Sequence, residues 1–524
     1  MAVAIFNDPG VYVVEEIIPV PAEPEIPTQP AAYIGPLFNV VDQEPVTTTE
    51  TTIKTAIEDQ TDLTVQYPNM KDSNNPIDTD SVKVELIKPD GRRAEIPETD
   101  GSGDTLLTIN PSDISISVYD DTNSEYYQFF KDLNDAWLGM KVDYSAADPD
   151  WSGIKDALVH VNYRAVREDL VGRVLEAQGP IGTQLRLGKA SLENPLGLMG
   201  GIASSVAPDT AAYYVPTKDY LTGIGDSGGT IDEQTEISQA TERLAPIRAY
   251  GVTALTSDEQ SHQIVTNHVN SMSEPEDKMF RVNWSYKPLP TEQEVRDFKN
   301  LDAGSELTEM DLKQGQVDIL SQYATAVSNK RTICLYNDFT IEIDGEEREL
   351  PGYYLAGAYA ALKSTIAPQQ GLTNYPMDGV AKKLKYQKGY FKPSQLKELS
   401  SAGMFVCTQN VESAPVTSRA QWTTNTLNNK TKQTSIRYCV DYFKWTLIDT
   451  LDPLIGVRNV IDASIREIRE TIENLIDEMR NAGIIIEAEI QQIIQNPDNA
   501  SQVDVTLQAT FPSPLDQIVI TLKY

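Results

Sequence analysis

Alternating hydrophobic and polar residues predict β-strands at both ends of the chain. Near the C-terminus, residues 484–494 (IIIEAEIQQII) and 503–511 (VDVTLQATF) flank the loop NPDNASQ, and residues 518–524 (IVITLKY) follow the break PSPLDQ. Near the N-terminus, residues 11–18 read VYVVEEII. The pattern therefore predicts a C-terminal hairpin and one further strand at each terminus.

A run of prolines separates the N-terminal strand from the rest of the chain. They are Pro19, Pro21, Pro24, Pro27, Pro30 and Pro36. Because proline fixes the backbone φ and is excluded from helix interiors, this run predicts an extended, semi-rigid arm. We expect the partner of the strand to lie far from its own neighbours in the chain.

The middle of the chain alternates between strand and helix patterns, as in an α/β unit. Residues 156–166 and 211–217 predict strands, and residues 191–205 predict a helix. Residues 245–286 read strand, helix, strand, and residues 352–365 (GYYLAGAYAALKST) predict an apolar helix that a larger body buries.

A long amphipathic helix is predicted immediately before the C-terminal hairpin. Asp452 and Pro453 suit its N-cap and first position, and Gly483 suits its end. Its apolar stripe has three- and four-residue spacing and comprises Val457, Ile461, Ile465, Ile468, Ile472, Leu475 and Met479. Charged residues fall off this stripe: Arg466, Arg469, Glu470, Glu473, Asp477 and Arg480.

Residues 41–150 predict a β-rich insertion of high negative charge. Within it, the residues SVKVELI, KPDGR and RAEIP predict a hairpin. The segment holds 8 basic and 24 acidic residues, a net charge of −16 against −34 for the whole chain. Such a surface repels phosphate backbones and anionic lipids, so we expect neither nucleic acid nor a membrane as a partner.

The cysteine content and the N-terminus indicate synthesis in a reducing compartment. Cys334, Cys407 and Cys439 are odd in number and widely spaced, which predicts no disulfide framework. The first residues carry no basic region of a secretory signal, and no run approaches the roughly 18 apolar residues of a membrane span. We expect no cofactor.

Two short motifs resemble enzyme signatures but lack the residues that those enzymes need. GDSGG (225–229) matches the nucleophile segment of trypsin-like proteases, which also require a base histidine; the only histidine upstream is His160, inside a predicted strand. We interpret this motif as a flexible turn. GTQLRLGKAS (182–191) is one residue too long for a phosphate-binding loop and lacks the hydroxyl residue after its lysine. We therefore expect no enzymatic activity.

Histidines and lysines offer weak binding-site signals. His262 and His268 share one predicted helix, but a six-residue separation is poor for metal ligands, and we interpret both as surface residues. The basic stretch AKKLKYQKGYFK (381–392) is too isolated for a nucleic-acid site on so acidic a chain. We predict a solvated loop there, with contact to an acidic neighbouring subunit as the alternative.

Several motifs, taken in order, resemble one family. PGVYVVEE closely resembles the opening of contractile phage tail sheath proteins, and ENPLGLMGGIASS followed by AAYYVPT is similar to a helix–strand step in their middle domain. IAPQQGLTNYPMDGV (366–380) and GMFVCTQN with SRAQWTTNT (403–426) are similar to a loop and a strand of their C-terminal domain. The matches cover residues 1–40 and 190–524, whereas 41–150 match no family, as expected for the variable outward-facing insertion.

The resemblance implies an α+β and α/β multidomain fold with a discontinuous sheath core, an α/β middle domain, a β-rich inserted outer domain and terminal strands exchanged between subunits. The expected parts are an N-terminal strand and arm (1–40), the insertion (41–150), the middle domain (151–345), the C-terminal sheath domain with the long helix and hairpin (346–511) and a C-terminal exchanged strand (512–524).

The resemblance also implies how subunits join. Sheath subunits stack as six-membered rings in a helical lattice around an inner tube, and neighbours lend strands to each other's hairpins. The lent strands would be Val11, Tyr12, Val13, Val14, Glu15, Glu16, Ile17 and Ile18, and Ile518, Val519, Ile520, Thr521, Leu522, Lys523 and Tyr524. The receiving hairpin would comprise Ile484, Ile486, Ala488, Ile490, Val503, Val505 and Leu507. Candidates for the tube contact are Arg466, Arg469, Glu470, Glu473 and Arg480, although this face could equally pack against the hairpin or meet solvent.

The partners implied are other copies of the chain, the inner tail tube protein, and baseplate and tail terminator proteins, with no nucleic acid and no membrane insertion. The implied place is the tail sheath of a virion assembled in the host cytoplasm, where contraction drives the tube through the host envelope. One alternative is the sheath of a related injection device (pyocin-like, type VI secretion or extracellular contractile system). An alternative of another class is a serine hydrolase built on GDSGG.

Overall fold

The computed structural model describes residues 29–42, 158–167 and 170–513, together with six strands between residues 43 and 157. Gaps in the described part fall at 222–230, 275–278, 303–305, 344, 374, 378–379, 388, 410–414, 421–422, 427–432, 456–458 and 498–500. The two predicted terminal strands, 11–18 and 518–524, and the GDSGG motif lie outside the described residues.

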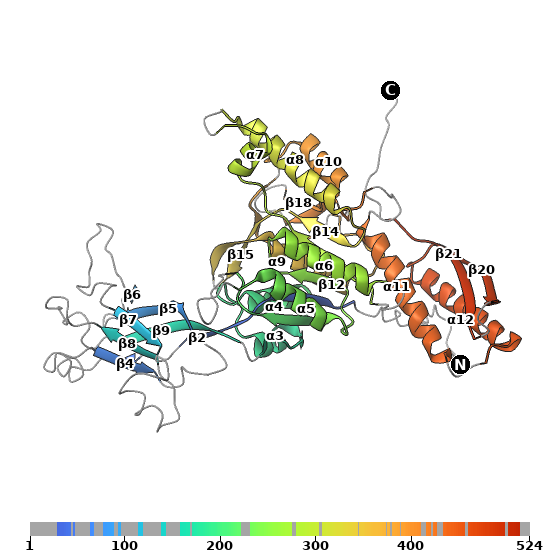
Figure 1. Ribbon diagram of the computed structural model, residues 1–524, viewed down its shortest axis with the longest axis horizontal. Helices are drawn as coiled ribbons and strands as arrows, with labels where there is room; N and C mark the ends of the chain where they lie inside the picture. Colours follow the sequence, from blue (N-terminus) through green and yellow to red (C-terminus); the bar gives the residue numbers. More distant parts are fainter. Residues whose placement is uncertain are drawn as a thin grey trace, which may run out of the picture.

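A six-stranded sheet forms the centre of the molecule (Figure 1). Its order is β10 (Leu175–Gln178), β11 (Ala211–Thr217), β1 (Ala31–Pro36), β12 (Gly251–Ala254), β13 (Val282–Tyr286) and β14 (Thr332–Leu335). All neighbours are parallel except β10, which runs antiparallel to β11. The α/β middle region predicted from the sequence is therefore confirmed.

Strand β1 is buried on both faces of this sheet. Ala31 and Tyr33 join the hydrophobic core on one side, and Ala32 and Ile34 join the core on the other. Such double burial is typical of a strand inside a parallel sheet and explains its apolar sequence AAYIGP. The sequence analysis assigned this segment to the proline-bearing arm, whereas the structure places it between β11 and β12.

Helices cover both faces of the sheet. On one face lie α4 (Pro195–Val206), with α3 (Gly179–Leu187) beside it, and α9 (Gly352–Thr365); on the other lie α5 (Glu233–Leu244) and α6 (Glu259–Met272). Residues 352–364 of α9 are all buried, as predicted for that apolar helix. Because α9 packs on β12 and β13, the predicted boundary at residue 346 divides one body rather than two domains.

A second helical layer extends from the β14 edge. It comprises α7 (Glu292–Phe298), α8 (Glu309–Val327) and α10 (Pro393–Ala402), with the two-stranded sheet β18 (Val406–Thr408) and β19 (Thr417–Ala420). Val317, Leu320, Leu399 and Val406 form its core. Figure 1 shows these helices at the top of the view.

The inserted segment leaves and rejoins the body through one pair of strands. β2 (Phe38–Asp42) pairs antiparallel with β9 (Leu158–Val166), and Figure 1 shows the inserted strands projecting to the left of the body. Its other strands are β3 (Val46–Thr47), β4 (Leu63–Tyr67), β5 (Ile77–Ile87), β6 (Arg93–Glu95), β7 (Ile114–Val118) and β8 (Leu138–Val142). β5 and β6 form the predicted hairpin. Because β9 pairs with β5, it belongs to the insertion and not to the middle domain.

The C-terminal part lies at the opposite side of the body, at the right of Figure 1. Helix α11 (Thr434–Leu451) leads through the short 3₁₀ turn η4 (Asp452–Leu454) to α12 (Asp462–Asn481), and the hairpin of β20 (Glu487–Gln495) and β21 (Val503–Thr510) follows. We call α12, β20 and β21 the terminal module.

The predicted start of the long helix is wrong. Asp452 has helical backbone angles at the C-cap of α11, and Ile455 and Ile461 are extended, so α12 begins at Asp462. The physical reason is that Pro453 has no N–H to donate to the carbonyl four residues earlier. Proline can therefore end the preceding helix as well as begin the next one. Helix α11 itself was not predicted.

A buried ionic cluster fixes α11 to the sheet. The Asp441 carboxylate accepts hydrogen bonds from Arg331 at 2.7 and 3.0 Å, from Arg437 Nε at 3.0 Å and from Tyr250 O–H at 2.9 Å. Asp441 is fully buried, and both arginine side chains are at most 6% exposed. Burial alone would raise the pKa of Asp441, but the adjacent guanidinium groups of Arg437 and Arg331 outweigh it and hold that pKa below its ordinary value.

Removing this carboxylate should destabilise α11 strongly. Asp441→Asn leaves two guanidinium groups buried without a counter-charge, and breaking such a pair costs about 3–5 kcal/mol. Hydrogen exchange of the α11 amides measures this loss as a lower free energy of local opening. Asp449→Asn is the matched control on the same helix, because its ion pair with Arg248 is about half exposed on both sides and contributes about 0–1 kcal/mol. Equal losses in the two variants would contradict the anchoring role.

The same cluster predicts a pH dependence. Because the folded-state pKa of Asp441 is depressed, its stabilisation is present above the unfolded value of about 3.9 and is lost as pH falls through the folded-state pKa. The difference between the native chain and Asp441→Asn in α11 opening should therefore shrink below about pH 4.

Candidate functional site

The terminal module is held together by the apolar face of α12. Ile472, Leu475, Ile476 and Met479 are at most 5% exposed and pack against the hairpin and α11. Of the predicted stripe, the C-terminal half is therefore buried as expected. Ile461 precedes the helix and is 58% exposed, and Val457 lies outside the described residues.

The hairpin pairs in a register that contains one irregularity. Glu487 lies opposite Thr510 and Gln495 lies opposite Val503, with a shift between Ile490 and Gln492 that leaves Gln491 as the extra residue. A bulge of this kind keeps side chains on one face although their sequence spacing changes from two to three. It explains why Ala488, Ile490 and Ile493 all contact the module core.

Both outer edges of this hairpin are open within the described part of the chain. β20 and β21 pair with each other and with no other described strand. On β21 the inward-facing Val503, Val505 and Leu507 pack against the core but remain half-buried. A two-stranded sheet is marginal by itself, and an unpaired edge presents N–H and C=O groups to any strand that arrives.

The predicted receiving residues fall at several kinds of position. Ala488, Ile490, Val503, Val505 and Leu507 lie on the inner face of the hairpin. Ile484 is buried in the turn before β20, and Ile486 is 56% exposed at the start of the strand pairing. The simple alternation assumed for residues 484–490 is therefore wrong at Ile486, because the chain is still turning after Gly483, whose φ is +71°.

A groove lies between the start of α12 and the first residues of β21. It has a volume of about 370 Å³ and is lined by η4, the start of α12 and the first residues of β21. Leu454, Ile455, Ile468 and Val505 give it a mainly apolar wall. Ile455 is 72% exposed, so this wall continues onto the surface of the molecule.

The charged side chains proposed for the tube contact form the outer face of α12. Arg466, Arg469, Glu470, Glu473 and Arg480 are all exposed. Arg469 lies 4.0 Å from Glu473, and Arg480 donates to Asp477 at 2.6 Å. Of the alternatives left open above, packing against the hairpin is excluded in this structure, since the hairpin lies against the opposite face of the helix.

A buried lysine stabilises the turn that supports the module. Lys363 Nζ on α9 donates to the carbonyls of Ala367, Pro368 and Gln370 at 3.2, 3.0 and 2.7 Å. Burial lowers the pKa of Lys363 to about 7. Gln369, in the middle of this loop, donates to the carbonyl of Ala482 at 2.9 Å, at the turn between α12 and β20.

The structure also shows where the motif GTQLRLGKAS and the three cysteines lie. GTQLRLGKAS lies on α3 and the turn that follows it, so the helix precedes the glycine and lysine instead of following them. The three cysteines are free and buried. No described helix is both long and apolar enough to cross a membrane, and no three described His, Cys, Asp or Glu side chains converge as metal ligands.

The prediction that His262 is a surface residue is wrong. It is 2% exposed, and its Nε2 accepts a hydrogen bond from the Tyr286 amide at 3.4 Å. Burial lowers its pKa to about 4, so it is neutral near pH 7. His268 contacts Arg281, and burial followed by the charge of this arginine lowers its pKa to about 4 as well. His160 lies on β9, and the GDSGG motif, far from it along the chain, lies outside the described residues.

The basic stretch 381–392 is not a purely solvated loop. Lys382 pairs with Glu342 at 3.1 Å and Glu347 at 2.8 Å, and Lys385 pairs with Glu349 at 2.5 Å. These carboxylates lie on β15 (Phe339–Ile343) and β16 (Glu346–Leu350), which form a sheet with β17 (Lys383–Leu384). The stretch therefore finds its acidic partner within its own chain.

No protein-family model and no curated protein match the chain. Solved structures do match its fold. The helical sheath of the anti-feeding prophage in its contracted state has 9% identity and a TM-score of 0.49, and the match covers 68% of this chain and 89% of that one. The contracted PVC sheath of an extracellular contractile injection system has 13% identity and a TM-score of 0.46, covering 67% and 87%. A sheath tail protein of Desulfitobacterium hafniense has 9% identity and a TM-score of 0.41, covering 96% and 100%.

The chain is similar to sheath proteins of contractile injection systems. This is the same class of protein that the sequence motifs resemble. At such low identity the likeness concerns the fold, and the roles of individual residues rest on the geometry described above.

The buried half of α12 should be essential to the terminal module. Ile472→Ala removes a side chain that is 1% exposed, and such a truncation costs about 2–5 kcal/mol. Ile461→Ala, within the stripe predicted from the sequence but 58% exposed, should change stability by less than about 0.5 kcal/mol. Hydrogen exchange of the β20 and β21 amides measures both effects, and similar losses would mean that Ile461 also packs in the module.

Proposed function

We propose that this chain is the structural subunit of a contractile sheath, which polymerises as stacked six-membered rings around an inner tube. The observation that carries the proposal is the terminal hairpin, whose two outer edges meet no other described strand. Terminal strands of neighbouring subunits, Val11–Ile18 and Ile518–Tyr524, would add to these edges and complete a four-stranded sheet. Both strands lie outside the described residues, and their exchange is part of the proposal.

The energetics of strand addition suit a linked lattice. Each added strand would contribute some half-dozen backbone hydrogen bonds at about 1 kcal/mol net each. It would also cover the half-buried Val503, Val505 and Leu507 and fill the groove beside them. Because each subunit gives two strands and receives two, a subunit leaves the lattice only when several links break together.

The outer face of α12 is proposed to contact the tube. Its arginine and glutamate side chains are exposed, and their ion pairs on the helix are at the surface, where exchange for intermolecular pairs costs little. The contact would orient each subunit on the tube, and the strand links would hold it to its neighbours.

Contraction would be a downhill rearrangement of a metastable lattice. The extended sheath would be kinetically trapped, and the contracted one would bury more surface between subunits. Baseplate and terminator proteins would hold the two ends of the extended form. In a phage tail, contraction of the sheath would drive the tube through the host envelope.

The kind of particle follows from what the sheath is attached to. We favour the tail of a virion assembled in the host cytoplasm, because an acidic insertion at the outer surface suits a variable decoration. The alternative is the sheath of a related injection device (pyocin-like, type VI secretion or extracellular contractile system). Electron microscopy of native particles separates the two, since a tail ends in a DNA-filled capsid.

The terminal strands should be required for assembly and not for folding. Ile518→Asp, Ile520→Asp and Leu522→Asp combined would place charge on the face that a neighbour buries, which is very costly. Thr521→Asp, on the opposite face of the same strand, is the matched control. Negative-stain microscopy of the full-length protein should show long striated tubes for the native chain and the control, and folded single subunits for the triple variant. Tubes formed by the triple variant would contradict the proposed exchange of terminal strands. Tubes formed by a chain that lacks residues 1–18 would contradict it as well.

The charged face of α12 should affect the tube and leave the lattice intact. Arg466→Glu with Arg469→Glu reverses two exposed charges without touching the module core. The expected result is a sheath that still polymerises alone but no longer co-sediments with tube protein. Arg248→Glu with Arg348→Glu reverses two half-exposed arginines outside α12 and is the charge-matched control. Loss of co-sedimentation in this control would indicate a general charge effect instead of a contact.

A further inference from the structure

A second cavity, unrelated to the terminal hairpin, opens at the carboxyl ends of the sheet strands. It has a volume of about 500 Å³. Its walls come from the segments after β11, β12, β13 and β14, the end of β16, and the first turns of α5 and α9. In the sheet, β11 lies on one side of β1 and β12 lies on the other, so the strand order changes direction at β1. Open α/β sheets bind ligands outside the carboxyl ends of their strands at such a switch point.

Three tyrosine rings line this cavity. Tyr220, Tyr286 and Tyr353 are between 3% and 8% exposed. Tyr220 donates to the carbonyl of Leu255 at 3.0 Å, and the rings of Tyr286 and Tyr353 meet edge to face with centroids 6.0 Å apart. The rings are therefore held in place before any ligand arrives, which is typical of a preformed pocket.

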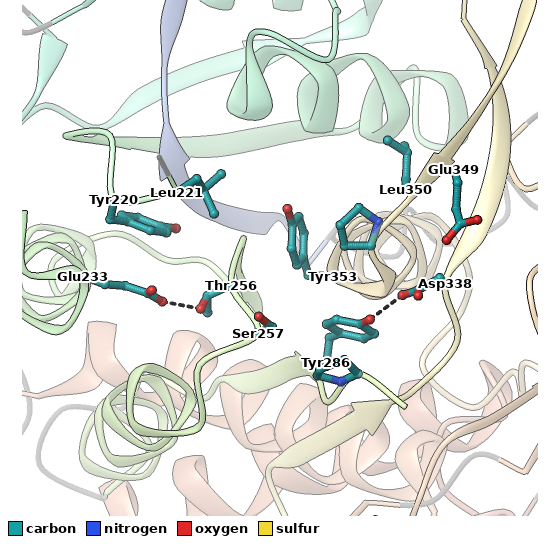
Figure 2. Close-up of a pocket in the computed structure, with 12 residues that line it drawn as sticks. Tyr220, Leu221, Glu233, Thr256, Ser257, Tyr286, Asp338, Glu349, Leu350 and Tyr353 are labelled. Carbon is teal, nitrogen blue, oxygen red and sulfur yellow. Dashed lines mark hydrogen bonds between the residues drawn. The ribbon is translucent and has the colours of Figure 1, made fainter. Parts of the chain in front are cut away.

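Carboxylates stand on two sides of these rings. Figure 2 shows Glu233 at one side of the cavity and Asp338 and Glu349 at the other, with Tyr286 and Tyr353 between them. Glu233 accepts from the Thr256 hydroxyl and has no cationic partner among the described residues. Asp338 accepts from the Tyr286 hydroxyl and from the Gly352 amide at 3.2 Å.

The charge of the cavity is negative overall. One ammonium group, that of Lys385, lies 2.5 Å from Glu349 and 3.5 Å from Asp338, so the three carboxylates are incompletely neutralised. Tyr353 lies near carboxylates on both sides of the cavity, and their negative charge affects its pKa. Burial, then Asp338 and Glu233, raises the pKa of Tyr353 to about 12.

We propose that this cavity binds a linear organic dication, of the diamine or polyamine class. One ammonium group would pair with Glu233 and the other with Asp338, while the methylene chain crosses the tyrosine rings. Carboxylates that are separated by aromatic rings match a ligand with two charges and an apolar middle, and ring faces add to the attraction for each cation. The volume suits a small molecule of this length.

Equilibrium dialysis of the full-length protein with putrescine tests the proposal, since it works for single subunits and for assembled tubes alike. We expect one molecule bound per chain at moderate salt and at least about tenfold weaker binding of n-butylamine, which has a single charge. Glu233→Gln and Asp338→Asn should each weaken putrescine binding about tenfold or more. Both substitutions keep an oxygen that accepts the existing hydrogen bonds.

Glu346→Gln is the matched control, because this carboxylate lies on β16 but outside the cavity, and it should leave binding unchanged. Equal weakening by all three variants would identify general attraction to an acidic chain and overturn the site. Failure to bind putrescine at millimolar concentration would do the same. If n-butylamine bound as tightly as putrescine, the two-ended mode of binding would be wrong.

Discussion

One buried carboxylate, Asp441, connects the central sheet to the C-terminal part of the chain. Arg331 immediately precedes β14 and reaches both the Arg281 carbonyl and Asp441, so the edge of the sheet and helix α11 share one guanidinium group. Replacing buried ion pairs with apolar residues is often neutral for stability, because desolvation offsets the attraction. What such a pair does fix is geometry: α11 has one rotation in which Asp441 meets Arg331 and Tyr250, which both belong to the sheet side, together. The other side of the helix then receives the core of the terminal module.

The elements with a clear periodicity were predictable from the sequence. The hairpin of β20 and β21, helices α4 and α9, and the alternation of strands and helices in the middle region all follow from patterns of two or of three and four residues. Elements that are buried on more than one side were not. In α11, Tyr438 and Trp445 pack on the body while Cys439 and Phe443 pack on the terminal module, so no single stripe stands out. Strand β1 is apolar on both faces and adjoins Pro30, which made it resemble the arm.

The details of the candidate site depended on contacts that a sequence does not display. The bulge at Gln491 changes which side chains of β20 face inward, and alternation alone assigns them wrongly. Lysines 382 and 385 read as a free basic patch because their carboxylate partners come from a hairpin about forty residues earlier. The tyrosine-lined cavity draws on segments spread over more than a hundred residues of chain, each of which is unremarkable alone.

The position of β1 decides how the chain would carry force. Residues that precede β1 lead directly into a strand that is bonded along its length to β11 on one side and to β12 on the other. A pull along that strand loads both rows of hydrogen bonds in shear, all at once. A pull on residues beyond Thr510 acts on the open end of a hairpin, where Thr510 lies opposite Glu487 and the bonds are loaded one after another. The two ends of the described chain therefore resist tension differently: a pull before β1 is opposed by two rows of bonds together, and a pull beyond Thr510 opens the hairpin bond by bond.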